Sequence, residues 1–189
     1  MISKGLVDEA RAAVRHTVER LAPFAERGIP IVGLEPSCQL SLRDEYLYLL
    51  PDDPRAQTVA EHAHTVEEFI DQLAVAGDLN LRFTDESRRV LLHGHGHQKA
   101  LVGTRPSRRV LSLPPNYTVT EVDSGCCGMA GSFGYEAEHY EISLKMAERR
   151  LLPAVREADA ETLIVAAGVS CRQQIKHGTG LRLAGSRRR

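Results

Sequence analysis

The sequence lacks an excess of basic charge, a long apolar run and a secretory signal, and each absence excludes a class of function. Its 189 residues carry 24 Lys and Arg against 25 Asp and Glu, so no excess of basic charge points to nucleic-acid binding. No apolar run approaches the roughly 20 residues that a membrane-spanning helix needs. Acidic residues occupy part of the first ten positions, where a secretory signal would be apolar. We therefore expect a cytoplasmic protein of one domain or two small ones, with no nucleic-acid partner and no membrane span.

Cysteine is also scarce, and all the cysteines lie in similar local sequences. The chain has four, which in a reducing compartment argues against a disulfide framework. Each lies just after an apolar run and close to Gly, Ser or Pro, where side chains converge on a site. They are Cys38, Cys126, Cys127 and Cys171.

Apolar periodicity predicts helices that alternate with short strands. The predicted helices cover residues 6–27, 57–76 and 136–157, and the predicted strands cover residues 29–34, 89–93, 118–122 and 162–166. This alternation favours an α/β fold with a mostly parallel sheet flanked by helices. Such sheets build their sites at the carboxyl ends of the strands. Cys171 follows the last predicted strand in this way, and we expect it to open a short helix.

The most distinctive segment is Asp-Ser-Gly-Cys-Cys-Gly-Met-Ala-Gly-Ser-Phe-Gly, which begins at Asp123. Adjacent cysteines point in opposite directions on a strand, so Cys126 and Cys127 need a tight turn to face one site. Glycines at Gly125, Gly128 and Gly131 permit that turn. Thiolates are soft ligands for iron–sulfur clusters, zinc and copper(I). The alternative is that both cysteines are small core residues.

Three of the eight histidines lie in the run His93-Gly-His95-Gly-His97, directly after a predicted strand. In an extended chain they would share one face. They could bind zinc or another divalent metal. They could also act as outer-shell donors to a metal site, or be chance members of a polar loop.

An ordered pattern occurs twice in the chain. A helix and a strand lead to Ser37-Cys38, and a second helix and strand lead to Ser170-Cys171. If this is a duplication, the chain begins inside a first unit. We then expect residues 1–56 to be the end of that unit, residues 57–180 to be a complete second unit, and residues 181–189 to be a solvated basic tail.

Three segments together resemble the cysteine-rich CCG domain: Gly-Leu-Glu-Pro-Ser-Cys38, the run from Ser124 to Tyr140 that contains the paired cysteines, and Gly-Val-Ser-Cys171-Arg-Gln-Gln-Ile. This domain occurs in heterodisulfide reductase, in the iron–sulfur component of glycolate oxidase and in anaerobic glycerol-3-phosphate dehydrogenase. The sequence is most similar to the C-terminal iron–sulfur region of FAD-linked oxidases of the D-lactate and D-2-hydroxyglutarate dehydrogenase type. The resemblance extends from Gly5 to about Gly180.

The resemblance implies an electron-transfer protein of CCG type, a fragment or split subunit that contains the two units outlined above. It implies an iron–sulfur cluster, expected to be [4Fe-4S], with Cys126, Cys127 and Cys171 as ligands and Cys38 as the fourth. His95 and His97 would flank the cluster, and Gly125, Gly128 and Gly131 would make room for it. FAD would lie on a partner or a missing domain, and a quinone or another acceptor would take the electrons. A peripheral position at the inner face of the membrane is compatible with this role.

The chain departs from the family pattern at one position. The family usually has His-Gly-His-Cys-His-Gln-Lys-Ala-Leu, and here Gly96 replaces the cysteine. Three other interpretations therefore stay open. A degenerate CCG domain without a cluster could act as a partner-binding module. The histidines and cysteines could bind a single zinc ion. Cys126 with a histidine base could form a cysteine hydrolase.

Overall fold

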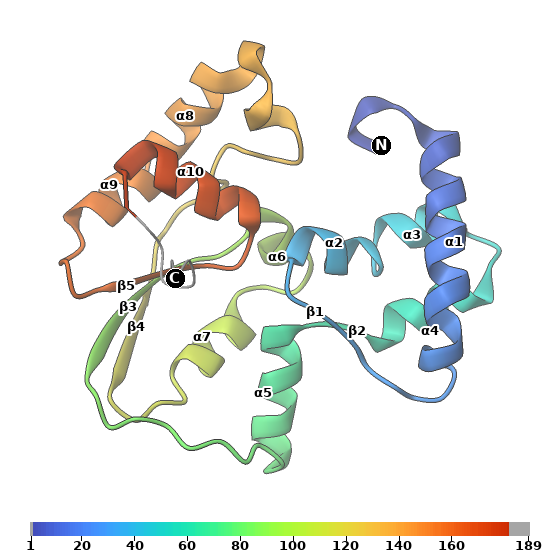
Figure 1. Cartoon of the computed structure of the whole chain (residues 1–189), viewed down its shortest axis with the longest axis horizontal. Coiled ribbons are helices and arrows are strands. Elements are labelled where there is room, and N and C mark those ends of the chain that lie inside the picture. The colour runs from blue at the N-terminus through green and yellow to red at the C-terminus, as the bar shows by residue number, and fades with distance from the viewer. Residues whose placement is uncertain (1, 182–189) are drawn as a thin grey trace, which may run out of the picture. The chain divides into compact units, whose positions relative to one another are not determined.

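The computed structural model describes residues 2–181 (Figure 1). Its strands are β1 (Ile31–Gly33), β2 (Ala63–Thr65), β3 (Arg88–His93), β4 (Tyr117–Glu121) and β5 (Leu163–Ala166). Its helices are α1 (Val7–Ala25), α2 (Pro36–Ser41), α3 (Glu45–Leu49), α4 (Pro54–His62), α5 (Val66–Ala76), α6 (Gly96–Leu101), α7 (Arg105–Leu111), α8 (Tyr140–Glu148), α9 (Leu151–Glu157) and α10 (Val169–Thr179). Short 3-10 turns are η1 (Ile2–Lys4), η2 (Phe133–Tyr135) and η3 (Ala137–His139).

The chain divides into two compact units between Phe69 and Ile70, within α5. In the first unit, β1 and β2 pair in parallel, with Ile31 opposite Ala63. Helix α1 packs against α4 through apolar side chains spaced along one face. The core of this unit consists of Val14, Val18, Ala22, Ala25, Leu42, Leu50, Ala56, Val59 and Ala63.

The second unit is built on a three-stranded parallel sheet in the order β4-β3-β5. In its register, Val90 of the central strand lies opposite Val119 on one side and Leu163 on the other. Helix α7 packs against β4, and α10 packs against β5 and α9. The α/β class and the parallel sheet are therefore confirmed. Since all three strands run the same way, their carboxyl ends meet at one edge of the sheet.

The predicted helix over residues 57–76 is wrong at its centre. The chain forms α4, then leaves the helix to add β2 to the sheet, and then forms α5. A capping box starts the second helix. The Glu68 amide donates to Thr65 Oγ1 at 3.2 Å, and the Thr65 amide donates to the Glu68 carboxylate at 3.0 Å. The Thr-x-x-Glu spacing was the sequence signal for this break.

The predicted helix over residues 136–157 is also interrupted. The structure has 3-10 turns before Tyr140, and α8 and α9 are separate helices. Pro153 explains the break, because it has no amide hydrogen and its ring would clash with the carbonyl of Arg149 in a continuous helix. The prolyl residue instead lies in the first turn of α9, where it is tolerated.

The two Ser-Cys segments have the same local structure. Cys38 is the third residue of α2 and Cys171 is the third residue of α10, and each helix follows a parallel strand. The next residue bonds back to that strand in both units. Gln39 donates to the Ile31 carbonyl at 2.6 Å, and Arg172 donates to the Ala166 carbonyl at 3.0 Å.

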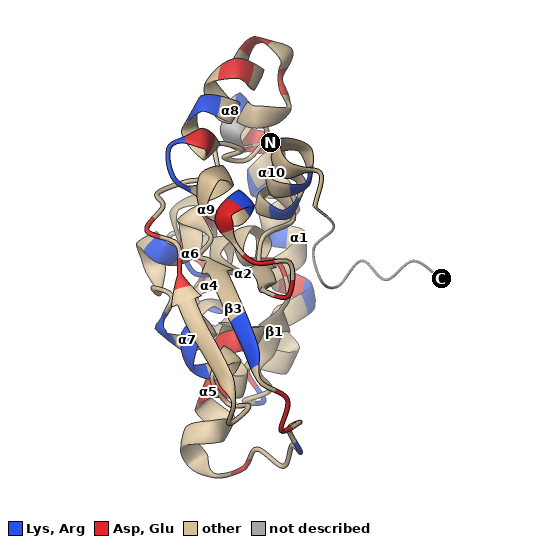
Figure 2. Ribbon diagram, turned by 90° about the vertical axis from the view of Figure 1, so that its left-hand side faces the viewer, with Lys and Arg blue, Asp and Glu red and all other residues tan. Residues whose placement is uncertain are grey.

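The assignment of these segments to two CCG units stays a prediction. The expected start of the second unit at residue 57 falls within α4, whereas the compact units divide within α5. Most of the predicted basic tail, residues 182–189, lies outside the described residues. Among residues 2–181, no helix combines the length and apolarity needed to cross a bilayer. Basic and acidic residues are interspersed along the ribbon of both units (Figure 2), in keeping with the net charge of −1.

Candidate metal centre

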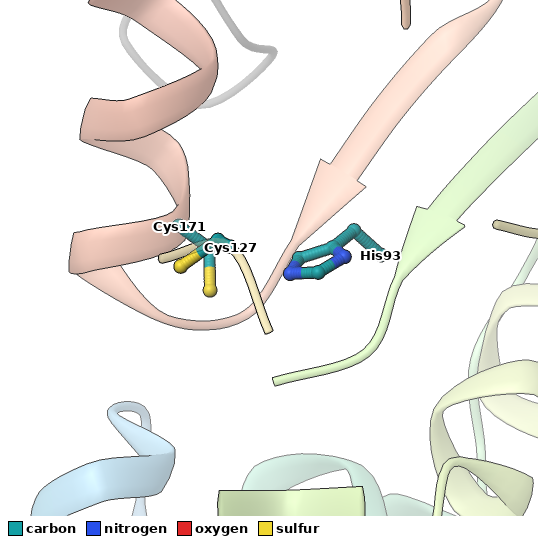
Figure 3. A group of neighbouring side chains, drawn as sticks. All are labelled: His93, Cys127 and Cys171. Carbon is teal, nitrogen blue, oxygen red and sulfur yellow. The ribbon is translucent and has the colours of Figure 1, made fainter. Parts of the chain in front are cut away.

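Three buried side chains converge at the carboxyl edge of the sheet in the second unit. They are His93, Cys127 and Cys171, and one ligand atom from each lies within 4.8 Å of the other two (Figure 3). Their exposed fractions are 1%, 3% and 1%. Spacing of this kind suits donors that bind one metal atom or adjacent iron atoms of a cluster.

Each donor comes from a different element. His93 is the last residue of β3, where it pairs with Ala166 of the neighbouring strand β5. After β5 the chain turns into α10, whose first turn carries Cys171. Cys127 lies in the loop that follows β4. The parallel order of the strands thus brings together residues that are far apart in the sequence.

The loop after β4 depends on Gly128. Its backbone has φ +92°, and a Cβ at this position would collide with the backbone carbonyl of Ser143 in α8. The amide of Gly128 also donates to Cys126 Sγ at 3.2 Å. The turn predicted from the glycine spacing therefore exists, and it places the thiol of Cys126 next to that of Cys127, to which it hydrogen-bonds.

Gln174 holds the same loop from the other side. This buried side chain on α10 donates to the Cys127 carbonyl at 3.0 Å, to the Ser143 carbonyl at 3.1 Å and to Ser143 Oγ at 3.0 Å. Sequence reasoning gave Gln174 no role. Its role could have been inferred from its position three residues after Cys171 on a helix, because that spacing places both side chains near one face.

The surroundings of Cys126 and Cys127 favour the protonated form of both thiols. A hydrogen bond with Cys127 and burial raise the pKa of Cys126 well above its usual range. For Cys127, the hydrogen bond with Cys126 lowers the pKa, but the hydrogen bond with Cys171 and burial outweigh it and raise the pKa to about 12. Neighbouring thiols in a buried site need a compensating cation before they ionise, and a metal provides it. The raised pKa of Cys126 gives no support to the hydrolase alternative, which needs a ready thiolate.

His93 was a candidate ligand in the zinc alternative, but it was not among the residues expected at the iron–sulfur cluster. Burial, and then the positive charge of Lys99, lower its pKa to about 4, so the imidazole is neutral near pH 7. Its Nδ1 lies 2.8 Å from Ser124 Oγ. Its Nε2 is buried and has no hydrogen-bond partner among residues 2–181.

The three histidines do not share one face as expected, because the chain leaves β3 at His93 and α6 begins at Gly96. His95 is buried against Gly168, at the start of α10, and His97 is half-buried. Neither belongs to the group formed by His93, Cys127 and Cys171. Their predicted role beside a cluster stays a prediction.

The remaining predicted residues occupy varied positions. Cys38 is exposed and lies in the first unit. Gly131 has φ +62°, which only glycine adopts readily. Gly125 has neither a positive φ nor any neighbour within 4 Å of an added Cβ. All four cysteines are free thiols. Which of these residues contact a metal stays a prediction.

Comparison with known proteins gives matches along nearly the whole chain. The chain is 27% identical to a subunit of the anaerobic glycerol-3-phosphate dehydrogenase of Escherichia coli (strain K12) over 183 residues. It is 29% identical to D-2-hydroxyglutarate dehydrogenase of the same strain over 182 residues, and 29% identical to that of Haemophilus influenzae over 181 residues. The expected similarity to these two kinds of dehydrogenase is thus confirmed.

The matches cover more than nine-tenths of this chain but only part of each relative. The chain spans 45% of the glycerol-3-phosphate dehydrogenase subunit and 17% of the two D-2-hydroxyglutarate dehydrogenases. No family model matches the sequence, and no solved structure does. Membership of the CCG family therefore stays a prediction.

Proposed function

We propose that this chain holds an iron–sulfur cluster and transfers electrons as part of an FAD-linked oxidoreductase. One observation carries the proposal: Cys127 and Cys171, with Cys126 beside them, belong to a group of buried donors at the carboxyl edge of a parallel sheet. Thiolates in such a setting are the usual ligands of iron–sulfur clusters. The relatives named as dehydrogenases or dehydrogenase subunits support the same class of reaction.

The residues present fit such a group. Cys126, Cys127 and Cys171 would supply thiolates, and the amides of Gly128 and Ala130, which lower the pKa of Cys126, favour its ionised form. The near-complete burial of Cys127 and Cys171 excludes water from the site. When bound, the cluster would accept and release single electrons.

In this proposal, neither the flavin nor the final electron acceptor is bound by this chain. FAD would lie on another domain or subunit, and a quinone or a similar acceptor would receive the electrons. The names of the relatives support this division, because one is a subunit of a dehydrogenase and the others are much longer than this chain.

The test is the iron and acid-labile sulfide content after anaerobic reconstitution. We expect both at equal stoichiometry, with about four of each for a [4Fe-4S] cluster. The double variant Cys127→Ser, Cys171→Ser should lose both. The variant Cys38→Ser is a separate test of the first unit: a loss of iron and sulfide would make the exposed Cys38 the fourth thiolate, and unchanged contents would remove it from the ligand set. Stoichiometric zinc without sulfide, or no metal at all, would contradict the proposal.

A further inference from the structure

We propose that His93 is itself a ligand of the metal centre, through Nε2, and that Ser124 positions its ring. This assignment rests on the proposed function for the nature of the metal. It concerns a residue that the cysteine motifs do not contain. It converts the set of three cysteines into a mixed set of three thiolates and one imidazole.

The imidazole of His93 is buried, and on one side it lacks a partner within residues 2–181. His93 is 1% exposed, and its Nε2 has no hydrogen-bond partner among the described residues. Buried polar atoms in proteins nearly always have a partner, and an unpaired one destabilises the fold. A metal ion is the partner that an imidazole nitrogen and neighbouring thiols would share.

The ring of His93 also lies beside the two buried thiols. A ligand atom of His93 lies within 4.8 Å of both Cys127 Sγ and Cys171 Sγ. Figure 3 shows the ring extending from the end of β3 toward the two sulfur atoms. Pairing of His93 with Ala166 fixes the backbone of the histidine in the sheet, so the ring is held on a rigid element.

The hydrogen-bond partner of Nδ1 favours the tautomer in which Nε2 can coordinate a metal. Metal-binding histidines usually donate their other ring N–H to a protein oxygen, which orients the ring and leaves the second nitrogen free to coordinate. Ser124 Oγ lies 2.8 Å from Nδ1 and can accept that hydrogen. The Lys99 ammonium donates to the carbonyl oxygen of Ser124 and thereby holds this residue in place.

The arrangement is specific to His93 within the histidine run. The other two histidines of the run lack this arrangement, since neither shares the site with Cys127 and Cys171.

The experiment is pulsed electron paramagnetic resonance on the reconstituted full chain in its paramagnetic state. Protein is prepared with natural nitrogen and with ¹⁵N-labelled histidine. We expect a strong hyperfine coupling to one histidine nitrogen that changes with the label. The coupling should vanish in His93→Cys, which can retain the cluster with a thiolate in place of the imidazole. It should persist in His177→Asn, an exposed histidine of α10 that serves as the matched control.

A second readout does not depend on the spin signal. The midpoint potential of His93→Cys, followed by visible absorbance, should shift to a more negative value because an anionic thiolate replaces a neutral ligand. A loaded cluster without histidine coupling, or an unchanged potential in His93→Cys, would overturn the assignment of His93 and leave the proposed function standing. A chain that binds no iron and sulfide would overturn both.

Discussion

The side-chain amide of Gln174 donates to the backbone carbonyl of Cys127 at 3.0 Å, and this bond joins α10 to the loop that carries the paired cysteines. The same amide also bonds to Ser143 of α8. Because Cys171 lies on α10 as well, one helix supplies a thiol and the anchor for the loop that bears the other. Gln174 therefore helps to hold the loop of Cys127 next to the helix that carries Cys171.

Replacement of this anchor should weaken both the fold and the site. In Gln174→Leu the carbonyls of Cys127 and Ser143 lose a buried donor, and we expect unfolding in urea to show a loss of about 1–3 kcal/mol. The iron content after reconstitution should fall in parallel. Gln173→Leu, the half-buried neighbour, is the control. Equal losses in both variants would remove Gln174 from the account.

Two glycines of the cysteine loop should respond differently to the same substitution. Gly128→Ala combines a positive φ with a clash against the Ser143 carbonyl, so we expect a loss of about 2 kcal/mol or more in stability. Gly125→Ala meets no neighbour within 4 Å and should change stability by less than about 0.5 kcal/mol. Thermal unfolding of the two variants measures the difference, and similar behaviour would contradict the loop geometry.

Gly96 offers a gain-of-function test. A Cβ added there meets nothing within 4 Å and its φ is not positive, so Gly96→Cys should fold like the parent protein. If the position belongs to the cluster site, as the family resemblance implies, the added thiol should raise the iron content and slow the loss of colour in air. Gly96→Ser has nearly the same size and no thiol. A serine variant that behaves like the cysteine variant would show that Gly96 is unrelated to the cluster.

Ser124 is expected to act through His93. Ser124→Ala removes the oxygen at 2.8 Å from Nδ1 and should weaken metal binding by about 10–100-fold, as loss of outer-shell partners commonly does. Competition with a chelator measures that affinity. Ser132→Ala, in the same loop with its hydroxyl bonded to Glu136, should leave the affinity unchanged. An equal affinity in both variants would argue that His93 needs no support from Ser124.

The sequence predicted the parts of this fold that depend on local patterns. The runs that became β3, β4 and β5 were recognised within one or two residues, because each is short and rich in apolar or β-branched residues. The helix over residues 57–76 was wrong at its centre because β2 forms only by pairing with β1, a contact between distant segments. Local periodicity does not contain that information.

In the site too, some features could be predicted from local sequence and others depend on contacts between distant segments. The cysteine spacing indicated a soft-metal site, and the structure brings Cys127 and Cys171 together. The choice among three histidines could not be made from their spacing, because the start of α6 at Gly96 changes the direction of the chain. His93 is distinguished by its burial, by its bond to Ser124 and by its place beside Cys127 and Cys171, all of which depend on the folded sheet.

The buried thiols of the second unit are proposed to hold a redox-active cluster. This is measured by anaerobic reductive titration of the reconstituted chain, followed by visible absorbance. We expect the absorbance to bleach with uptake of about one electron per cluster and to return on oxidation. The double variant of Cys127 and Cys171 should show no such change. A metal-loaded chain whose spectrum is unaffected by reductant would rule out a redox-active cluster at this site.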